Sequence, residues 1–212
     1  MIEVPVYDSH GQEVDRIKVD TSQFGGTVRY SLLKQSLVMY HSNKRAGTAS
    51  TRGRSLQAGS GRKLYRQKGT GFARVGNSRV GKRVGGGVTF AKTARDFSQR
   101  MPKKQKRRAR DSALLSKMFG EKLFCVEAIK FDKPRTRDFV GLLNNLQIKR
   151  SCLVAISGRD ENLYKSGRNV PGVSVTDVSQ LNAGDICRHE KILFTRDAFL
   201  SLLDKSKAEV AG

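Results

Sequence analysis

The residues of this chain that could do chemistry are cations gathered in one segment. Residues 44–110 hold 21 Lys and Arg residues against a single acid, Asp96, so this segment accounts for +20 of the formal charge of +22. Residues 21–95 contain no Asp or Glu at all. Like charges at this density repel one another unless a polyanion lies beside them. The chemistry that the segment offers is therefore the recognition of phosphate groups.

The side chains that accompany the charges indicate which polyanion fits. Arg is more frequent than Lys in the segment, and the planar guanidinium group suits two-point contacts with phosphate. Interleaved glycines let a backbone approach its partner closely, and aromatic side chains can stack on bases, here Tyr65, Phe72, Phe90 and Phe97. A folded nucleic acid with crevices fits these features better than a smooth duplex. We expect it to be bound by Lys44, Arg45, Arg52, Arg54, Arg62, Lys63, Arg66, Lys68, Arg74, Arg79, Lys82, Arg83, Lys92, Arg95, Lys103, Lys104, Arg107 and Arg108.

Two glycine motifs in the segment resemble nucleotide-binding loops only in part. Gly69-Thr70-Gly71 followed by Gly76 has the wrong spacing for a dinucleotide loop. Residues 76–82 fit the first seven positions of a phosphate-binding loop, but Arg83 stands where a Ser or Thr would hold magnesium. No apolar strand precedes either motif. A phosphate-loop NTPase is therefore the least favoured function, and we expect no cofactor.

Metal and catalytic sites are equally poorly supported. Cys125, Cys152 and Cys187 are spaced by 27 and 35 residues, which fits neither a disulfide framework nor a zinc site. Residues 44–95 contain no carboxylate that could act as a general base. We expect reduced core cysteines, no bound metal, no small-molecule substrate and no enzymatic activity. No stretch approaches the length of a membrane span, so no membrane partner is expected.

The elements that must position the cations come from the nearly neutral remainder of the chain. Alternating apolar residues predict strands at 2–6 and 14–19 around a His10-Gly11 turn, and helical spacing of apolar residues predicts a helix over 27–43. After residue 101 we expect a helix at 102–120, a strand at 123–129, a helix at 135–146, a strand at 152–156, a helix at 161–167, a strand at 173–175, a helical turn at 177–182, a strand at 192–194 and a helix at 196–203.

These elements predict an α/β fold. The strand at 152–156 lacks a polar face, which is typical of a parallel sheet covered on both sides. We expect a three-layer domain with a mostly parallel sheet, formed by residues 1–43 and 96–212, and a long extended basic loop inserted after the first helix. This loop, residues 44–95, is called the arm below. Its large apolar residues are too sparse to offset the entropy of ordering, so we expect it to be disordered when free.

A specific sequence signature lies in the middle of the arm. Residues 61–74 read G-R-K-L-Y-R-Q-K-G-T-G-F-A-R and resemble the signature of the universal family of the fourth protein of the large ribosomal subunit, usually K-P-W-R-Q-K-G-T-G-R-A-R. Further matches follow in the same order at residues 86–90, Ala113-Leu114, residues 160–163 and residues 168–170. The resemblance covers essentially the whole chain, and the short C-terminus is bacterial in type.

The resemblance implies a structural protein of the cytoplasmic large ribosomal subunit. Its globular domain would lie on the outside of the subunit and its arm would thread into large-subunit rRNA, beside neighbouring ribosomal proteins. In this family the loop tip lines a narrow part of the nascent-peptide exit tunnel, which makes the nascent peptide a further partner. The matching tip residues here are Tyr65, Arg66, Gln67, Lys68, Gly69 and Thr70.

The chain departs from the family pattern at three places. Leu64-Tyr65 replaces Pro-Trp, Phe72 replaces the usual Arg, and Arg83-Val84 replaces a second aromatic before the Gly85–Gly87 run. Composition alone would also allow a free basic protein that condenses nucleic acid. The large neutral domain and the non-repetitive arm argue against that alternative.

Overall fold

The computed structural model describes residues 1–158 and 160–211. The chain divides into two units, one made of residues 1–40 and 100–212 and the other of residues 41–99. We call them the α/β unit and the arm unit, and each is described by itself.

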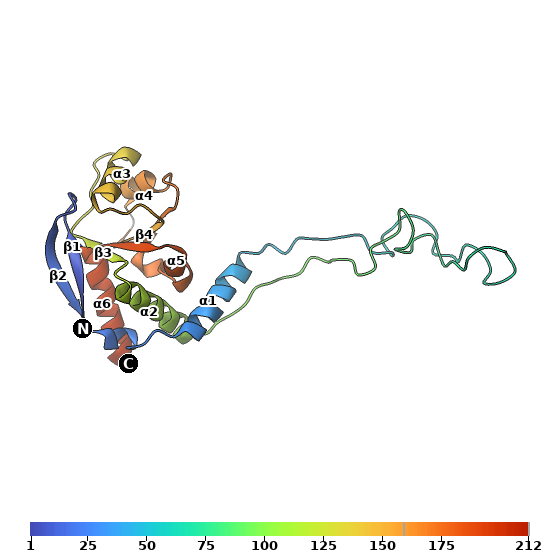
Figure 1. Cartoon of the computed structure of the whole chain (residues 1–212), viewed down its shortest axis with the longest axis horizontal. Coiled ribbons are helices and arrows are strands. Elements are labelled where there is room, and N and C mark those ends of the chain that lie inside the picture. The colour runs from blue at the N-terminus through green and yellow to red at the C-terminus, as the bar shows by residue number, and fades with distance from the viewer. Residues whose placement is uncertain (159, 212) are drawn as a thin grey trace. The chain divides into compact units, whose positions relative to one another are not determined.

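The α/β unit is built on a six-stranded sheet with the strand order β2-β1-β3-β6-β4-β5 (Figure 1). The strands are β1 (Ile2–Tyr7), β2 (Glu13–Val19), β3 (Leu123–Val126), β4 (Cys152–Ile156), β5 (Val173–Asp177) and β6 (Lys191–Thr195). β1 and β2 pair antiparallel around a turn in which the Gly11 N–H donates to the Asp8 carbonyl at 3.0 Å. All other neighbouring strands pair parallel. The predicted hairpin and mostly parallel sheet are confirmed.

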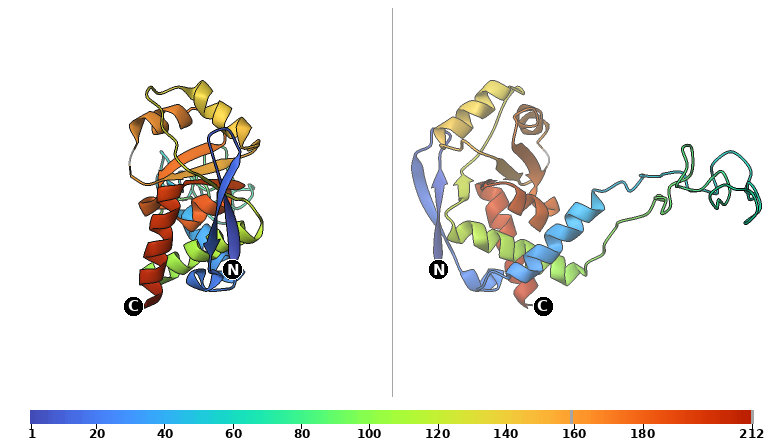
Figure 2. Two further views of the ribbon diagram at one scale, coloured as in Figure 1. Left: turned by 90° about the vertical axis from the view of Figure 1, so that its left-hand side faces the viewer. Right: turned by 45° about the vertical axis from the view of Figure 1, so that its right-hand side comes forward.

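Helices cover both faces of this sheet, which confirms the three layers. Two helices lie on one face, α3 (Thr136–Asn145) and α4 (Glu161–Gly167), while α2 (Lys103–Phe119) and α6 (Arg196–Ala211) lie on the other (Figure 1, Figure 2). Shorter elements are η1 (Thr21–Phe24), η2 (Val178–Gln180) and α5 (Ala183–Arg188), and α1 spans Tyr30–Asn43. Along β4, Leu153 and Ala155 belong to the core on the α2 side, whereas Cys152 and Val154 belong to the core on the α3 side. A strand buried on both faces has no polar side, as its sequence indicated.

The structure corrects two local predictions. The strand expected at 123–129 ends at Val126, and Ile129 is buried in the α3-side core beyond the end of the strand. α5 was not predicted, because a helix of six residues shows too little periodicity to recognise. Its Gly184 lies against α1: a Cβ there would be 2.9 Å from Tyr40 Cδ2.

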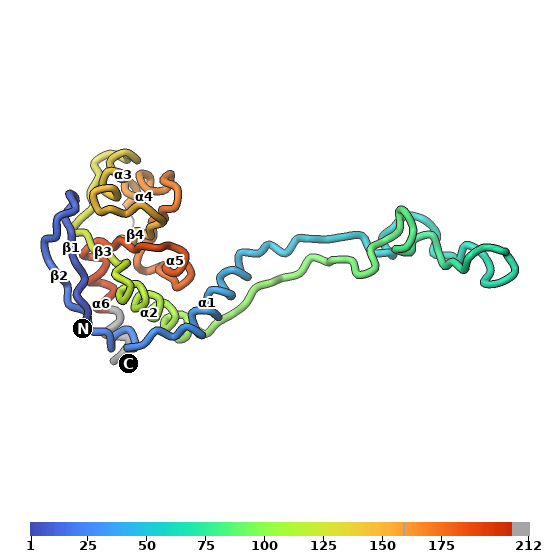
Figure 3. Tube along the Cα trace, viewed as in Figure 1, coloured from blue at the N-terminus to red at the C-terminus, as the bar shows by residue number. Residues whose placement is uncertain are grey.

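The arm unit is held together by turns and by hydrogen bonds between its outgoing and returning segments. Between the end of α1 and the start of α2, a range that is fully described, there is no helix or strand beyond one isolated bridge that pairs Gly53 with Val88. Two segments, 47–53 and 87–95, lie side by side (cyan and green in Figure 3). Their backbone donor–acceptor pairs are Arg95 N to Gly47 O at 3.1 Å, Thr51 N to Lys92 O at 2.9 Å and Val88 N to Arg52 O at 2.9 Å.

Candidate nucleic-acid interface

The predicted binding residues share one property, which is exposure. Seventeen of the eighteen have exposed side chains, and only Arg79 is half-buried. Fourteen of them belong to the arm, which contains no acid that could pair with them. A surface of cations without internal counter-charges attracts phosphate over long range and can contact it directly.

The single acid beside the arm does not neutralise this surface. Asp96 accepts hydrogen bonds from the Ser98 hydroxyl at 2.5 Å and the Ser98 backbone N–H at 2.8 Å. These bonds, with the hydroxyl contributing most, hold the pKa of Asp96 below its ordinary value. The carboxylate thus stays ionised, but its single charge stands against the fourteen cations of the arm.

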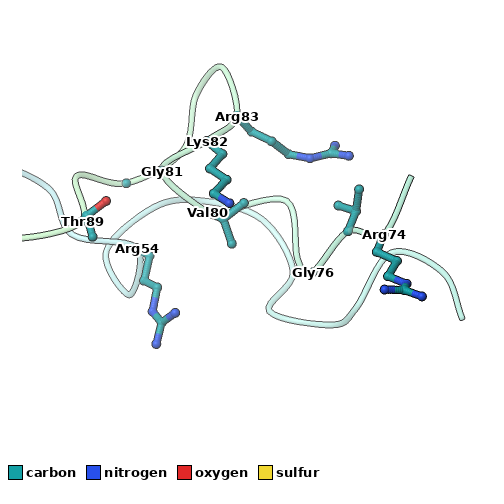
Figure 4. Close-up of a pocket in the computed structure, with 10 residues that line it drawn as sticks. Arg54, Arg74, Gly76, Val80, Gly81, Lys82, Arg83 and Thr89 are labelled. Atoms are coloured by element: carbon teal, nitrogen blue, oxygen red, sulfur yellow. The ribbon is translucent and has the colours of Figure 1, made fainter. Parts of the chain in front are cut away.

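The middle of the arm contains a hollow lined by cations. Its volume is about 740 Å³, and Arg54, Arg74, Lys82 and Arg83 line it together with small and apolar residues (Figure 4). No acid contributes to the lining. Such a hollow suits a polyanion rather than a neutral ligand.

A close crossing of the two arm segments forms one side of this hollow. Gly87 is buried, and a Cβ at its position would lie 2.3 Å from the backbone nitrogen of Arg54. The glycine-rich turn that leads into Gly87 is closed by the Gly87 N–H, which donates to Arg79 O at 3.0 Å, and by the Gly86 N–H, which donates to Arg83 O at 3.0 Å. Only glycine permits this contact between two backbones. Neither a strand nor a helix flanks residues 76–82, so the structural context of a phosphate-binding loop is missing there.

The predicted tip forms a loop closed by its own polar groups. The Leu64 N–H donates to Gly76 O at 3.0 Å, and the Lys63 ammonium donates to Val75 O at 2.9 Å and to Gln67 Oε1 at 2.8 Å. Lys63 therefore uses two of its three donors inside the loop. Lys63, a predicted phosphate ligand, therefore also holds the loop closed.

The aromatic pair of the loop is equally local. The Tyr65 hydroxyl donates to the Ala73 carbonyl, and the ring centroids of Tyr65 and Phe72 are 6.2 Å apart with an interplanar angle of 49°. Arg66 Nη2 donates to Gly69 O at 2.8 Å. Phe72 remains 77% exposed. The loop thus presents an open aromatic face.

The basic start of α2 is the second cationic surface. The helix begins at Lys103 after Pro102, with no side-chain cap and no acid in its first turn. Lys103, Lys104 and Arg108 are exposed, while Ala109 and Ala113 are buried in the core. Free N–H groups at a helix start favour an anion, so the lysines and the backbone there attract the same kind of ligand.

The sequence prediction left three residues out of the binding set that belong to the same surfaces. Arg100 and Lys106 are exposed cations of the same charged segment. Phe97 was considered only as an aromatic that could stack on bases, although two cations lie over its ring. Charge counting could have found the first two. Contacts between residues far apart in the chain carry no local signal.

Burial shifts the pKa of several titratable groups in the α/β unit. Burial raises the pKa of the Cys125 and Cys152 thiols to about 12. Burial also lowers the pKa of Lys117, whose ammonium donates to His189 O at 2.6 Å and to Glu190 O at 3.0 Å. Within the described residues there is no group of three His, Cys, Asp or Glu that could hold a metal ion, and no helix long and apolar enough to cross a membrane.

Comparison with known proteins decides which family carries these surfaces. The family model described as "Ribosomal protein L4/L1 family" matches residues 17–205. The chain belongs to this family. It is therefore a ribosomal protein and not an enzyme, as the resemblance of residues 61–74 implied.

Curated relatives cover nearly the whole chain. The large ribosomal subunit protein uL4 of Natranaerobius thermophilus is 39% identical over 198 residues, which are 93% of this chain and 96% of the relative. The uL4 protein of Carboxydothermus hydrogenoformans is 40% identical over 95% of this chain and 98% of its own length. That of Rhodopirellula baltica is 40% identical over 93% of this chain and 90% of its own length.

Proposed function

We propose that the chain is a structural constituent of the large ribosomal subunit that binds large-subunit rRNA through its arm and the basic start of α2. The observation that carries the proposal is the exposure of seventeen of the eighteen predicted phosphate ligands. The names of the relatives as large ribosomal subunit proteins support the same assignment. Its partners are then large-subunit rRNA and neighbouring ribosomal proteins, and its location is the ribosome of the cytoplasm.

The finer proposal concerns the loop at residues 65–70. We infer that it contributes to the wall of the nascent-peptide exit tunnel, where a nascent peptide would pass. The support is the sequence signature of residues 61–74 together with the closed loop that Lys63, Tyr65 and Arg66 maintain. A loop held by its own hydrogen bonds keeps its shape at a crowded wall without requiring a bond to every neighbour.

We also propose that the two parts of the chain have different roles. Residues 1–43 and 96–212 act as the globular part, and residues 44–95 act as the part that enters rRNA. Beyond its base, where Arg95 bonds to Gly47 and Asn43 to Gln99, the free arm has few apolar contacts of its own and orders fully when phosphates offset its charge. Most of its binding free energy is then electrostatic and depends on salt.

Equilibrium binding of the full chain to purified large-subunit rRNA at several salt concentrations tests the proposal. We expect a log-log slope of about −9 if roughly ten phosphates are neutralised. A slope near zero would contradict the use of these cations. Fractionation of a lysate separates the remaining alternative: migration with free DNA, away from large subunits, would indicate a nucleic-acid condenser instead.

A further inference from the structure

Two arginines at the base of the arm lie over one aromatic ring. The guanidinium carbon of Arg45 is 3.9 Å from the centroid of the Phe97 ring, and that of Arg95 is 4.4 Å from it. Both arginines are exposed, and Phe97 is half-buried. We call these three residues the Arg-Phe-Arg stack. It joins residues from the two ends of the arm.

The backbone around the stack is tied on both sides. The Arg95 N–H donates to Gly47 O at 3.1 Å, and a Cβ at Gly47, whose φ is +68°, would lie 2.1 Å from Arg95 O. Asn43 and Gln99 exchange two hydrogen bonds, in which the Gln99 N–H donates to Asn43 Oδ1 at 2.8 Å and Asn43 Nδ2 donates to Gln99 O at 3.3 Å. The two ends of the arm that carry the stacked side chains are therefore tied to each other within the arm unit.

The stack carries two positive charges, and the acid next to it in sequence, Asp96, supplies one negative charge and accepts its hydrogen bonds from Ser98. The two guanidinium carbons are no further apart than the sum of their distances to the ring. The negative face of the ring offsets part of the repulsion between the cations. The ring supplies no oxygen acceptor, so its contacts with the two guanidinium carbons leave the N–H donors at the edges of both groups available. Those edges are the part of Arg that binds phosphate by two points.

We propose that the Arg-Phe-Arg stack is a preformed binding subsite for an RNA phosphodiester at the base of the arm. The proposal rests on the rRNA-binding function proposed above. It separates two kinds of cation in the arm. Lys63 and Arg66 donate hydrogen bonds to carbonyls of their own loop. Arg45 and Arg95 instead contact an aromatic ring, which leaves the N–H donors at the edges of their guanidinium groups available for phosphate. Because the stack is oriented before binding, less side-chain entropy is lost when phosphate arrives.

Binding of the full chain to purified large-subunit rRNA tests the subsite through Phe97→Leu. This substitution removes the aromatic face and keeps all cations. We expect affinity to fall about threefold to tenfold, from the loss of one or two exposed cation–π contacts. The salt slope should stay unchanged, because the same phosphates are neutralised. Phe97→Tyr, which restores the ring, should bind within about twofold of the original chain.

Matched variants make the outcome decisive. Phe119→Leu changes a half-exposed phenylalanine of the α/β unit and should leave affinity unchanged. The double variant Arg45→Gln with Arg95→Gln should make the slope about 0.9 less negative, since the subsite neutralises one phosphate and each phosphate contributes about 0.9. The proposed subsite would be overturned if Phe97→Leu and Phe119→Leu bind rRNA with equal affinity. It would also be overturned if the salt slope of the double variant is unchanged. A flat slope in the original chain would instead refute rRNA binding itself, so the two failures are distinguishable.

Discussion

Gly87 is the residue on which the packing of the arm most depends. It is buried, and a Cβ there would come within 2.3 Å of the backbone nitrogen and 2.5 Å of the Cα of Arg54. Gly87→Ala forces the two segments apart, at a cost of about 1–3 kcal/mol. Because Gly87 lies outside the α/β core, we expect this cost to appear in rRNA affinity, with the thermal unfolding of the α/β unit unchanged.

The matched control for this substitution is Gly61→Ala. Nothing lies within 4 Å of a Cβ at Gly61, and its backbone is not in the left-handed region. Titration of both variants with large-subunit rRNA should show a loss for Gly87→Ala alone. If the two variants bind equally well, the crossing of the arm segments does not persist in the bound protein.

The lysines at the start of α2 are expected to favour rRNA binding and to lower the stability of the helix. Lys103 and Lys104 lie in a first turn without an acid, where the helix dipole disfavours positive charge. Replacing both by Gln should raise the free energy of unfolding by roughly 0.5–2 kcal/mol. The same variant should bind rRNA more weakly, with a slope about 1.8 less negative. Chemical denaturation and salt-dependent titration measure the two effects.

A gain in the free energy of unfolding together with a loss of rRNA affinity distinguishes a binding surface from an ordinary solvated one. The double variant Lys130→Gln with Lys133→Gln removes the same charge from exposed positions between β3 and α3. It should change neither the free energy of unfolding nor the slope appreciably. A gain in stability without any loss of affinity in the α2 variant would remove α2 from the interface.

The elements show how far the sequence could predict this fold. The run Cys152–Ile156 predicted a strand buried on both faces, because burial is determined locally by the lack of polar residues. α5 escaped prediction because six residues with two buried side chains show no period.

The cations of the interface were predictable from charge alone. The contact of Arg45 with Phe97, and the bond from Lys63 to the Val75 carbonyl, depend on how separate parts of the arm meet, which no local pattern encodes.

The chain as a whole separates the stability of its core from the charge of its arm. Among the side chains that the structure describes, every buried residue of the two hydrophobic cores lies between Val4 and Leu33 or between Ala109 and Leu203. Removal of residues 46–94 deletes eleven cations and no core residue. The new junction joins Arg45 to Arg95, and these residues already lie over the same ring. We therefore expect the deletion to leave a folded α/β unit with weak rRNA affinity.

Buried thiols report whether this shortened chain is folded. Burial raises the pKa of Cys125 and Cys152 to about 12, so in the folded unit both remain protonated and unreactive at pH 8. We expect slow labelling by a thiol reagent until a cooperative unfolding transition, after which both thiols react rapidly. The full-length chain serves as the control and should show the same transition. Immediate labelling of the shortened chain, or loss of the cooperative transition, would mean that the arm contributes to the core and that the two units do not fold independently.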